Sequence, residues 1–348
     1  MDWEEALDQY GGLVEERLED FLSELVEDRK YYHPFISDLY SKIREYVLRK
    51  GKRLASCSTL LTYKGYTGEL DDRILNACIG VELFRHSILI HDDLVDQDEY
   101  RRGGPALHRL FSDEYDERFS EGTAIFMGDA MYALALQAFR NPRFTEEKIS
   151  ELLRLFEKGY REVNESQVLD LLFESKEPDV EEWQIMASRR AATLFRTTIL
   201  AGAIPAEALE EDRNLLEKAA THVGYAFDIQ DDIIDIFASE EQYGRPPGGD
   251  LRHGKTPLHM VHALKLAGEE DLKTLRGLVG KESLTREELE STREIIRKSG
   301  ALEAAKNESK RHAETAKELI AKTRLDKETK EFLSSLISYI EQSLDWYK

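Results

Sequence analysis

The amino-acid sequence predicts an all-helical protein. Apolar residues recur at helical spacing in several long windows, and no comparable alternating pattern of strands appears. The clearest windows are 14–29, 149–174 and 328–348. The 8 prolines stand where helices are expected to begin or end, namely Pro34, Pro105, Pro142, Pro178, Pro205, Pro246, Pro247 and Pro257.

The loops and the size of the chain set its expected organisation. The best loop candidates are residues 98–120 and 239–256, where turn-forming residues cluster. A chain of 348 residues, 41% of them hydrophobic, can fill one large core or two smaller ones. Because no repeat or low-complexity linker interrupts it, we expect one domain over residues 1–348.

Composition limits the classes of function. With 34% charged residues, no apolar stretch approaches the roughly 20 residues that span a bilayer, so no integral membrane segment is expected. The acidic N-terminus does not resemble a signal peptide, and Cys57 and Cys78 form no disulfide framework, so a cytoplasmic protein is expected. A net charge of -21 argues against binding to nucleic acid.

The first chemical motif is "HDDLVD", residues 91–96. On a helix, Asp92 and Asp96 project from one face a turn apart, with Asp93 beside them. Carboxylates in this arrangement suit Mg²⁺, which retains waters and is usually completed by phosphate oxygens. One such motif is weak, and a solvated acidic helix end is the alternative.

The second motif, "FDIQDDIIDIF" at residues 227–237, repeats the arrangement with Asp231, Asp232 and Asp235. Its neighbours are strongly apolar, which is unusual for a solvated helix face. If the two helices face each other, their carboxylates can hold a cluster of Mg²⁺ ions across a cavity. Two structural acidic patches are the alternative.

Cations follow both motifs. Arg101 and Arg102 follow the first, "GKTP" with Lys255 follows the second, and Lys52 and Arg53 stand near the start. Cations beside metal-binding carboxylates suggest a polyphosphate ligand, although each alone is more typical of a surface ion pair. No phosphate-binding glycine loop precedes a helix, so a nucleotide-binding fold is not supported.

These motifs together resemble the trans-isoprenyl diphosphate synthases of the polyprenyl synthetase family, and most of all geranylgeranyl diphosphate synthases. The resemblance covers nearly the whole chain. Its landmarks, in the family's order, are "GKR" (51–53), "LIHDDLVDQDEYRRGGPALH" (89–108), "GDA" (128–130), "SQVLDL" (166–171), "DIQDDIID" (228–235) and "GGDLRHGKTP" (248–257).

The resemblance implies a single-domain bundle of long, mostly antiparallel helices around a central cavity, usually as a homodimer. It also implies a head-to-tail condensation of isopentenyl diphosphate with an allylic diphosphate. Two or three Mg²⁺ ions would draw charge onto the leaving diphosphate, so that an allylic carbocation forms in a cavity that excludes water.

The resemblance assigns roles residue by residue. The six aspartates of the two motifs match the metal site, with Asp92, Asp96 and Asp231 expected as direct ligands. Arg101, Arg190 and Lys255 match the allylic diphosphate site, and Lys52, Arg53, Arg85 and Arg102 match the isopentenyl diphosphate site. Gln167 and Asp170 line the reaction site in relatives, and Asp92, Asp96, Asp231, Lys255, Gln167 and Arg190 are the expected catalytic set. His91 and His108 are expected to be hydrogen-bonding supports.

Several positions depart from the family pattern. Arg85, followed by His86, replaces a histidine; Arg190 and Ala191 replace a Lys-Thr pair; and Asp228 replaces a glutamine. "GKRLAS" also lacks the usual arginine and proline. These changes leave open a weakly active or regulatory subunit of a synthase complex. A terpene cyclase is disfavoured by the second DDxxD motif, and a purely structural helical protein by the pairing of the motifs.

Product length can be argued from helix geometry. Residues preceding Asp92 on its helix should point down the cavity, so Ile88, Ser87 and Phe84 are expected to form the floor. Because Ser87 is small and Phe84 lies about 4.5 Å deeper at a rise of about 1.5 Å per residue, a twenty-carbon product, geranylgeranyl diphosphate, is predicted. If Phe84 turns into the bundle, a longer product follows.

Overall fold

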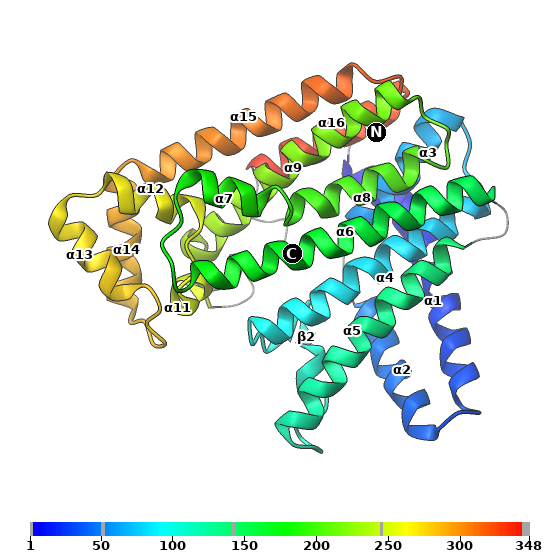
Figure 1. Ribbon diagram of the computed structural model, residues 1–348, viewed down its shortest axis with the longest axis horizontal. Helices are drawn as coiled ribbons and strands as arrows, with labels where there is room; N and C mark the ends of the chain where they lie inside the picture. The colour runs from blue at the N-terminus through cyan, green and yellow to red at the C-terminus, as the bar shows by residue number, and fades with distance from the viewer. Residues whose placement is uncertain (1–2, 50–52, 141–143, 244–245, 343–348) are drawn as a thin grey trace. The chain divides into compact units, whose positions relative to one another are not determined.

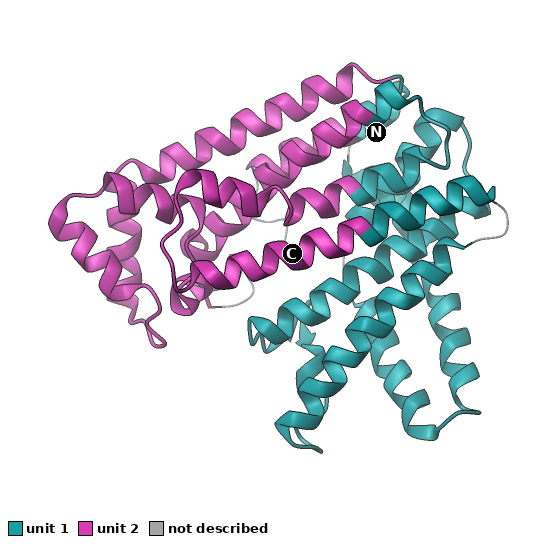
Figure 2. Ribbon diagram, in the orientation of Figure 1, with its two compact units in different colours: residues 1–157, 197–213, 324–332 teal, residues 158–196, 214–323, 333–348 magenta. Residues whose placement is uncertain are grey.

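The computed structural model describes residues 3–49, 53–140, 144–243 and 246–342. Nearly all of these residues that form regular structure are helical, which confirms the predicted all-α class. The chain divides into two compact units (Figure 2). Unit 1 comprises Met1–Glu157, Thr197–Arg213 and Arg324–Phe332, and unit 2 comprises Lys158–Arg196, Asn214–Thr323 and Leu333–Lys348.

Unit 1 is built on the N-terminal helices (Figure 1). Helix α4 packs against α5, α3 and α1, and α1 also packs against α2. A Cβ at Gly128 of α5 would lie 2.2 Å from Nε2 of His91, so a larger residue at this position would force the His91 ring of α4 to move. The elements are α1 (Trp3–Arg29), α2 (Pro34–Leu48), α3 (Leu54–Thr67), α4 (Asp72–Val95), β1 (Tyr100–Arg101), β2 (Gly104–Pro105), η1 (Leu107–Arg109) and α5 (Glu117–Phe139).

Unit 2 has its core around Trp183 and Phe173, where α12 packs against α15, α14, α13 and α7. Its own elements are α7 (Val180–Ala187), α10 (Glu240–Tyr243), α11 (Gly249–His253), α12 (Leu258–Leu266), α13 (Glu269–Leu278), α14 (Arg286–Lys298) and α15 (Ala301–Ala321). The chain passes from one unit to the other between Thr323 and Arg324 and within four helices, namely α6 (Glu146–Phe173), α8 (Ala191–Ala203), α9 (Glu210–Phe237) and α16 (Lys327–Gln342). One domain over 1–348 therefore stays a prediction.

Two details differ from the sequence-based expectations. Residues 98–120 contain a short antiparallel hairpin, in which Tyr100 pairs with Pro105 and Arg101 with Gly104. Strands of two residues are too short to show an alternating pattern. Among the described residues, α4 is long and apolar enough to cross a bilayer by length and composition, contrary to the expectation that no stretch approaches this length. Of its most apolar window, 67% is buried within the protein, as in a core helix.

Candidate active site

The first aspartate motif lies at the C-terminal end of α4, in unit 1. The helix begins at Asp72, after the Asp71 side chain accepts hydrogen bonds from two backbone N–H groups. It ends at Val95, and the backbone N–H of Asp96 donates to the carbonyl of Asp92 at 2.8 Å. Because a helix C-terminus carries partial negative charge, carboxylates placed here favour a bound cation.

The three carboxylates of this motif differ in burial. Asp92 and Asp96 are half-buried, whereas Asp93 is fully buried. Asp93 accepts hydrogen bonds from the Tyr46 hydroxyl at 2.9 Å and from Nε of Arg101 at 2.6 Å. Burial raises the pKa of Asp93, although Arg101 opposes this shift. The motif thus offers two accessible carboxylates, while the third holds Arg101 in place.

The β1–β2 hairpin presents the two adjacent arginines. Arg102 and Gly103 form its turn with φ values of 51° and 77°, the left-handed region that tight hairpins require. Arg49, which follows α2, donates to the carbonyls of Arg101 at 3.2 Å and Pro105 at 2.6 Å. Sequence reasoning missed Arg49, because nothing in its neighbourhood signals a contact with a hairpin so far along the chain.

A buried charge network lies beside the hairpin. Glu82 accepts hydrogen bonds from Ser56 at 2.6 Å and from Nη1 of Arg53 at 3.3 Å. His86 contacts the Glu82 carbonyl at 2.7 Å through Nδ1 and Nη1 of Arg102 at 3.3 Å through Nε2. Burial favours the neutral form of Glu82, but the charges of Arg53 and Arg85 and the Ser56 hydrogen bond oppose it, and the pKa of Glu82 is lowered to about 2.

Positive charge dominates this network. Burial and then the charge of Arg85 lower the pKa of Arg102 to about 10. Nε and Nη2 of Arg53 are buried and have no hydrogen-bond partner among the described residues. Three guanidinium groups lie around Glu82, and a second carboxylate, that of Glu15, lies 3.9 Å from Nη2 of Arg53. The remaining N–H groups suit an anion that supplies further acceptors.

The second aspartate motif lies on α9, in unit 2. Ile229, Ile233 and Ile236 of this helix pack into the unit 2 core, which explains the apolar residues around the motif. Asp231 is half-buried, whereas Asp232 and Asp235 are buried. Asp231 is therefore the most accessible carboxylate of this motif, and the other two are enclosed by the fold.

Arg190, between α7 and α8, contacts three buried or half-buried carboxylates. It donates to Asp228 at 3.0 Å through Nε, to Asp170 at 3.4 Å through Nη1 and to Asp232 at 3.4 Å through Nη2. Burial raises the pKa of Asp228 to about 6, although Arg190 lowers it, and burial also raises the pKa of Asp232. Two of the departures from the family pattern, Arg190 and Asp228, are therefore in direct contact.

Asp235 ties the motif to α11. Its two carboxylate oxygens accept hydrogen bonds from the backbone N–H groups of Gly249 at 3.2 Å and Asp250 at 3.1 Å. Lys255, just beyond α11, lies 3.4 Å from Asp170, and its backbone N–H donates to the Asp250 carbonyl at 2.9 Å. Asp250 was not predicted as a site residue, although it lies within a landmark motif. Burial and the nearby Asp235 raise the pKa of Asp250.

The donor set of unit 2 fits a hard cation such as Mg²⁺. Oδ2 of Asp228 and Oδ2 of Asp232 are buried and have no hydrogen-bond partner among the described residues. A buried carboxylate oxygen without a donor is costly unless a cation or water contacts it. Within the part of the chain that the structure describes, no group of three or more His, Cys, Asp or Glu side chains is arranged to hold a metal by itself. Phosphate oxygens and waters usually complete Mg²⁺ coordination.

The predicted floor residues pack inside unit 1. Phe84 is buried, with its ring edge-on to Phe156 at 4.8 Å and tilted against Tyr132 at 6.3 Å. Ser87 is fully buried and donates to the Phe84 carbonyl at 2.7 Å, and Ile88 is also buried. The Phe84 ring is thus held by side chains of α5 and α6.

The remaining predicted residues are placed as follows. Lys52 lies outside the described residues. Gln167 is half-buried on α6, less than one turn before Asp170. His91 contacts the Ile125 carbonyl at 3.1 Å, as a hydrogen-bonding support should. His108 is buried, but neither of its ring nitrogens has a hydrogen-bond partner among the described residues, so its expected supporting role has no described contact.

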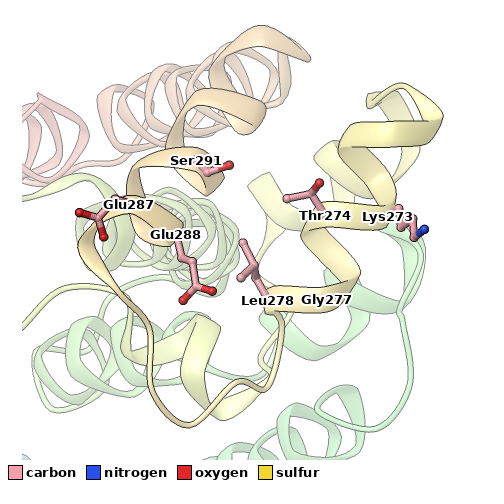
Figure 3. Close-up of a pocket in the computed structure, with 7 residues that line it drawn as sticks. All are labelled: Lys273, Thr274, Gly277, Leu278, Glu287, Glu288 and Ser291. Atoms are coloured by element: carbon pink, nitrogen blue, oxygen red, sulfur yellow. The ribbon is translucent and has the colours of Figure 1, made fainter.

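A surface pocket of about 470 Å³ in unit 2 contains none of the predicted residues (Figure 3). Helix α13 lines one side and α14 the other. Glu288 is already engaged there, because it forms a capping box with Thr285 and accepts a hydrogen bond from Lys281 at 2.5 Å. The lining residues are Lys273, Thr274, Gly277, Leu278, Glu287, Glu288 and Ser291.

Helical packing, two aspartate-rich helices and cations beside each define a class of α-helical enzymes that act on diphosphates. The family model described as polyprenyl synthetase matches residues 37–296, and the chain belongs to this family. It is a prenyltransferase, which confirms the class of enzyme expected from the sequence motifs.

Known relatives agree with this class. The chain is 32% identical over 280 residues to a short chain isoprenyl diphosphate synthase of Methanocaldococcus jannaschii, covering 80% of this chain and 83% of that protein. It is 30% identical to a geranylfarnesyl diphosphate synthase of Aeropyrum pernix, covering 83% and 89%. A crystal structure of geranylgeranyl pyrophosphate synthetase from Pyrococcus horikoshii Ot3 matches with a TM-score of 0.84 and 27% identity, covering 98% and 99%.

Proposed function

We propose that this prenyltransferase condenses isopentenyl diphosphate with an allylic diphosphate, with Mg²⁺, to give geranylgeranyl diphosphate. The observation that carries the proposal is that each aspartate motif pairs accessible carboxylates with enclosed cations. In unit 1, Asp92 and Asp96 are half-buried, and Asp92 lies 3.7 Å from Arg101. In unit 2, Asp231 is half-buried on the helix whose Asp228 and Asp232 contact Arg190, and Lys255 contacts Asp170. Polyprenyl synthetases generally depend on Mg²⁺.

We assign the metal ions to both motifs. Asp92, Asp96 and Asp231 act as direct ligands of two or three Mg²⁺ ions, because their carboxylates are the more accessible ones. Asp93, Asp232 and Asp235 hold the surrounding cations and backbone in place. When bound, Mg²⁺ supplies positive charge to the leaving diphosphate and so assists cleavage of the allylic C–O bond.

We assign the diphosphates by the cations beside each motif. Arg101, Arg190 and Lys255 bind the allylic diphosphate, where Asp93 and Asp170 keep Arg101 and Lys255 oriented. Arg53, Arg85 and Arg102, with Lys52, bind isopentenyl diphosphate. The excess of positive charge around Glu82 supports this second assignment, since a diphosphate would supply the missing acceptors.

We propose that Phe84 sets the twenty-carbon limit. Contacts with Phe156 and Tyr132 hold its ring, and the residue three positions nearer the first aspartate motif is the small Ser87. If the growing chain instead passes beside Phe84, the product is longer than twenty carbons.

One assay tests the reaction and the product together. Purified protein is incubated with Mg²⁺, labelled isopentenyl diphosphate and five-, ten- or fifteen-carbon allylic diphosphates, and the dephosphorylated products are sized. We expect a twenty-carbon alcohol, and a fifteen-carbon alcohol from Ser87→Phe. Longer products from the natural protein, or an unchanged length from Ser87→Phe, would contradict the floor assignment. Absence of elongation from folded protein would contradict the reaction and favour a regulatory subunit.

We also propose that the protein acts as a homodimer in the cytoplasm. The resemblance to the family supports a dimer, and so do exposed apolar side chains such as Phe126 of α5, which is 72% exposed. Light scattering should give the mass of a dimer. Phe126→Glu should shift the mass toward the monomer, whereas Leu13→Glu, at an exposed apolar position on α1, should not. A monomeric natural protein would contradict the proposal.

A further inference from the structure

His86 lies beside Arg102 in a way that the family resemblance does not explain. We infer that His86 is a positioning residue, which orients the Arg102 guanidinium toward the diphosphate of isopentenyl diphosphate without neutralising it. The inference rests on the proposed role of Arg102 and adds the residue that directs it.

Hydrogen-bond chemistry determines the state of the His86 ring. Nδ1 lies 2.7 Å from the Glu82 carbonyl, which can only accept, so Nδ1 carries the proton and donates. Arg102 has only donors, so its contact at 3.3 Å with Nε2 requires a lone pair on Nε2. The ring is therefore a neutral imidazole that donates through Nδ1 and accepts through Nε2.

The surroundings keep the ring neutral and oriented. Burial, followed by the charge of Arg102, lowers the pKa of His86 to about 3, despite the opposing charge of Glu82. The Tyr46 ring meets the His86 ring at 6.1 Å and 77°, and the Tyr46 hydroxyl donates to Asp93. His86 is thus held on one side by the α4 backbone and on another by a residue that also contacts the first aspartate motif.

A neutral acceptor has a specific consequence at this position. Arg85 and Arg53 repel Arg102, whereas the charge of Glu82 attracts it. The contact with Nε2 of His86 adds a directional acceptor that fixes the orientation of the guanidinium. A carboxylate there would neutralise Arg102 and compete with a diphosphate. An imidazole uses one of the five guanidinium N–H groups and leaves the full positive charge in place.

Two isosteric substitutions separate the two hydrogen bonds of His86. His86→Gln places an amide oxygen near Nε2 and preserves the acceptor for Arg102, whereas His86→Asn preserves only the Nδ1 side. Steady-state kinetics of the full chain with Mg²⁺ should show a KM for isopentenyl diphosphate raised about tenfold in His86→Asn, as expected for one lost hydrogen bond to a charged group. The kcat and the KM for the allylic substrate should change less than twofold, and His86→Gln should keep the KM for isopentenyl diphosphate within about threefold.

Controls distinguish a positioning role from loss of a buried ring. His259→Leu removes an imidazole from α12, where neither ring nitrogen has a hydrogen-bond partner among the described residues, and should leave both KM values unchanged. Equal effects of His86→Asn and His86→Gln, or a parallel rise in both KM values, would overturn the inference.

Arg102→Gln tests the assignment on which the inference rests. It should raise the KM for isopentenyl diphosphate at least as much as His86→Asn. If Arg102→Gln raises this KM and His86→Asn does not, the role of His86 is refuted and that of Arg102 stands. If Arg102→Gln leaves it unchanged, both the Arg102 assignment and the inference fail.

Discussion

Replacement of Glu82 by glutamine should destabilise the protein far more than loss of an ordinary surface carboxylate. Glu82 is 1% exposed and accepts hydrogen bonds from Ser56 and Arg53. Glutamine keeps the shape of the side chain but removes its charge. Arg53, itself buried, would then lack its nearest counter-charge.

The magnitude follows from the pKa of Glu82, which the protein lowers from 4.5 to about 2. At about 1.36 kcal/mol per pKa unit, this difference corresponds to about 3 kcal/mol of stability at neutral pH. Breaking a buried ion pair by removing one partner typically costs about 3–5 kcal/mol, in agreement. Because the folded pKa is the lower one, this stability is fully present above pH 4.5 and is lost as the pH falls toward about 2.

Urea unfolding at pH 7 measures the effect. Glu82→Gln should lower the free energy of unfolding by about 3 kcal/mol, and this deficit should shrink below pH 4.5. The double variant Arg53→Met with Glu82→Leu should cost less than the sum of its single variants, because it removes both partners of this ion pair and leaves neither one facing an apolar side chain. Glu177→Gln, which removes an exposed ion pair with Arg276, is the matched control and should cost less than about 1 kcal/mol. A Glu82→Gln deficit no larger than that of the control, or full additivity in the double variant, would refute the reasoning.

Two further predictions concern helix contact and charge pairing. Gly128→Ala should lower the free energy of unfolding by about 1–3 kcal/mol, because its Cβ would lie 2.2 Å from the His91 ring. In Gly122→Ala, on the same helix, the new Cβ would meet nothing within 4 Å, so the free energy of unfolding should stay the same or rise by up to about 1 kcal/mol. Equal urea midpoints for the two variants would contradict the close contact at Gly128. Arg190→Met should lower the free energy of unfolding, measured in urea with EDTA, by about 3 kcal/mol, because it leaves buried carboxylates such as Asp228 unpaired. Adding Asp228→Asn to Arg190→Met should restore at least about 1 kcal/mol of the free energy of unfolding. A further decrease in the double variant would argue against compensation between the two positions.

The sequence predicted the helical class and the two motifs because both depend on local periodicity. The motif aspartates stand at helical spacing, and the apolar residues between the second set, such as Ile229 and Ile233, do pack into a core. The spacing also predicts which carboxylates share a helix face. Asp93 is buried and Asp92 is half-buried, a difference that no spacing rule predicts. The assignment of Asp92 as a metal ligand stays a prediction.

Contacts between distant segments could not be predicted from the sequence. Tyr46 of α2 donates to Asp93 of α4, and Arg49, which follows α2, donates to the Pro105 carbonyl of the hairpin. Neither residue belongs to a motif, and tyrosine or arginine at a helix end is common. Asp250 lies within a landmark motif, but only Lys255 of that motif was assigned a role from the sequence.

The departures from the family pattern form contacts that compensate one another. Asp228 adds a negative charge beside the second motif, and Arg190 meets it together with Asp170 and Asp232. A guanidinium can direct separate N–H groups at three carboxylates, which the single ammonium of lysine does less well. Arginine in place of lysine keeps the positive charge, and its Nε donates directly to the carboxylate that Asp228 adds. Because the added carboxylate has a cationic partner, we favour an active synthase over a regulatory subunit.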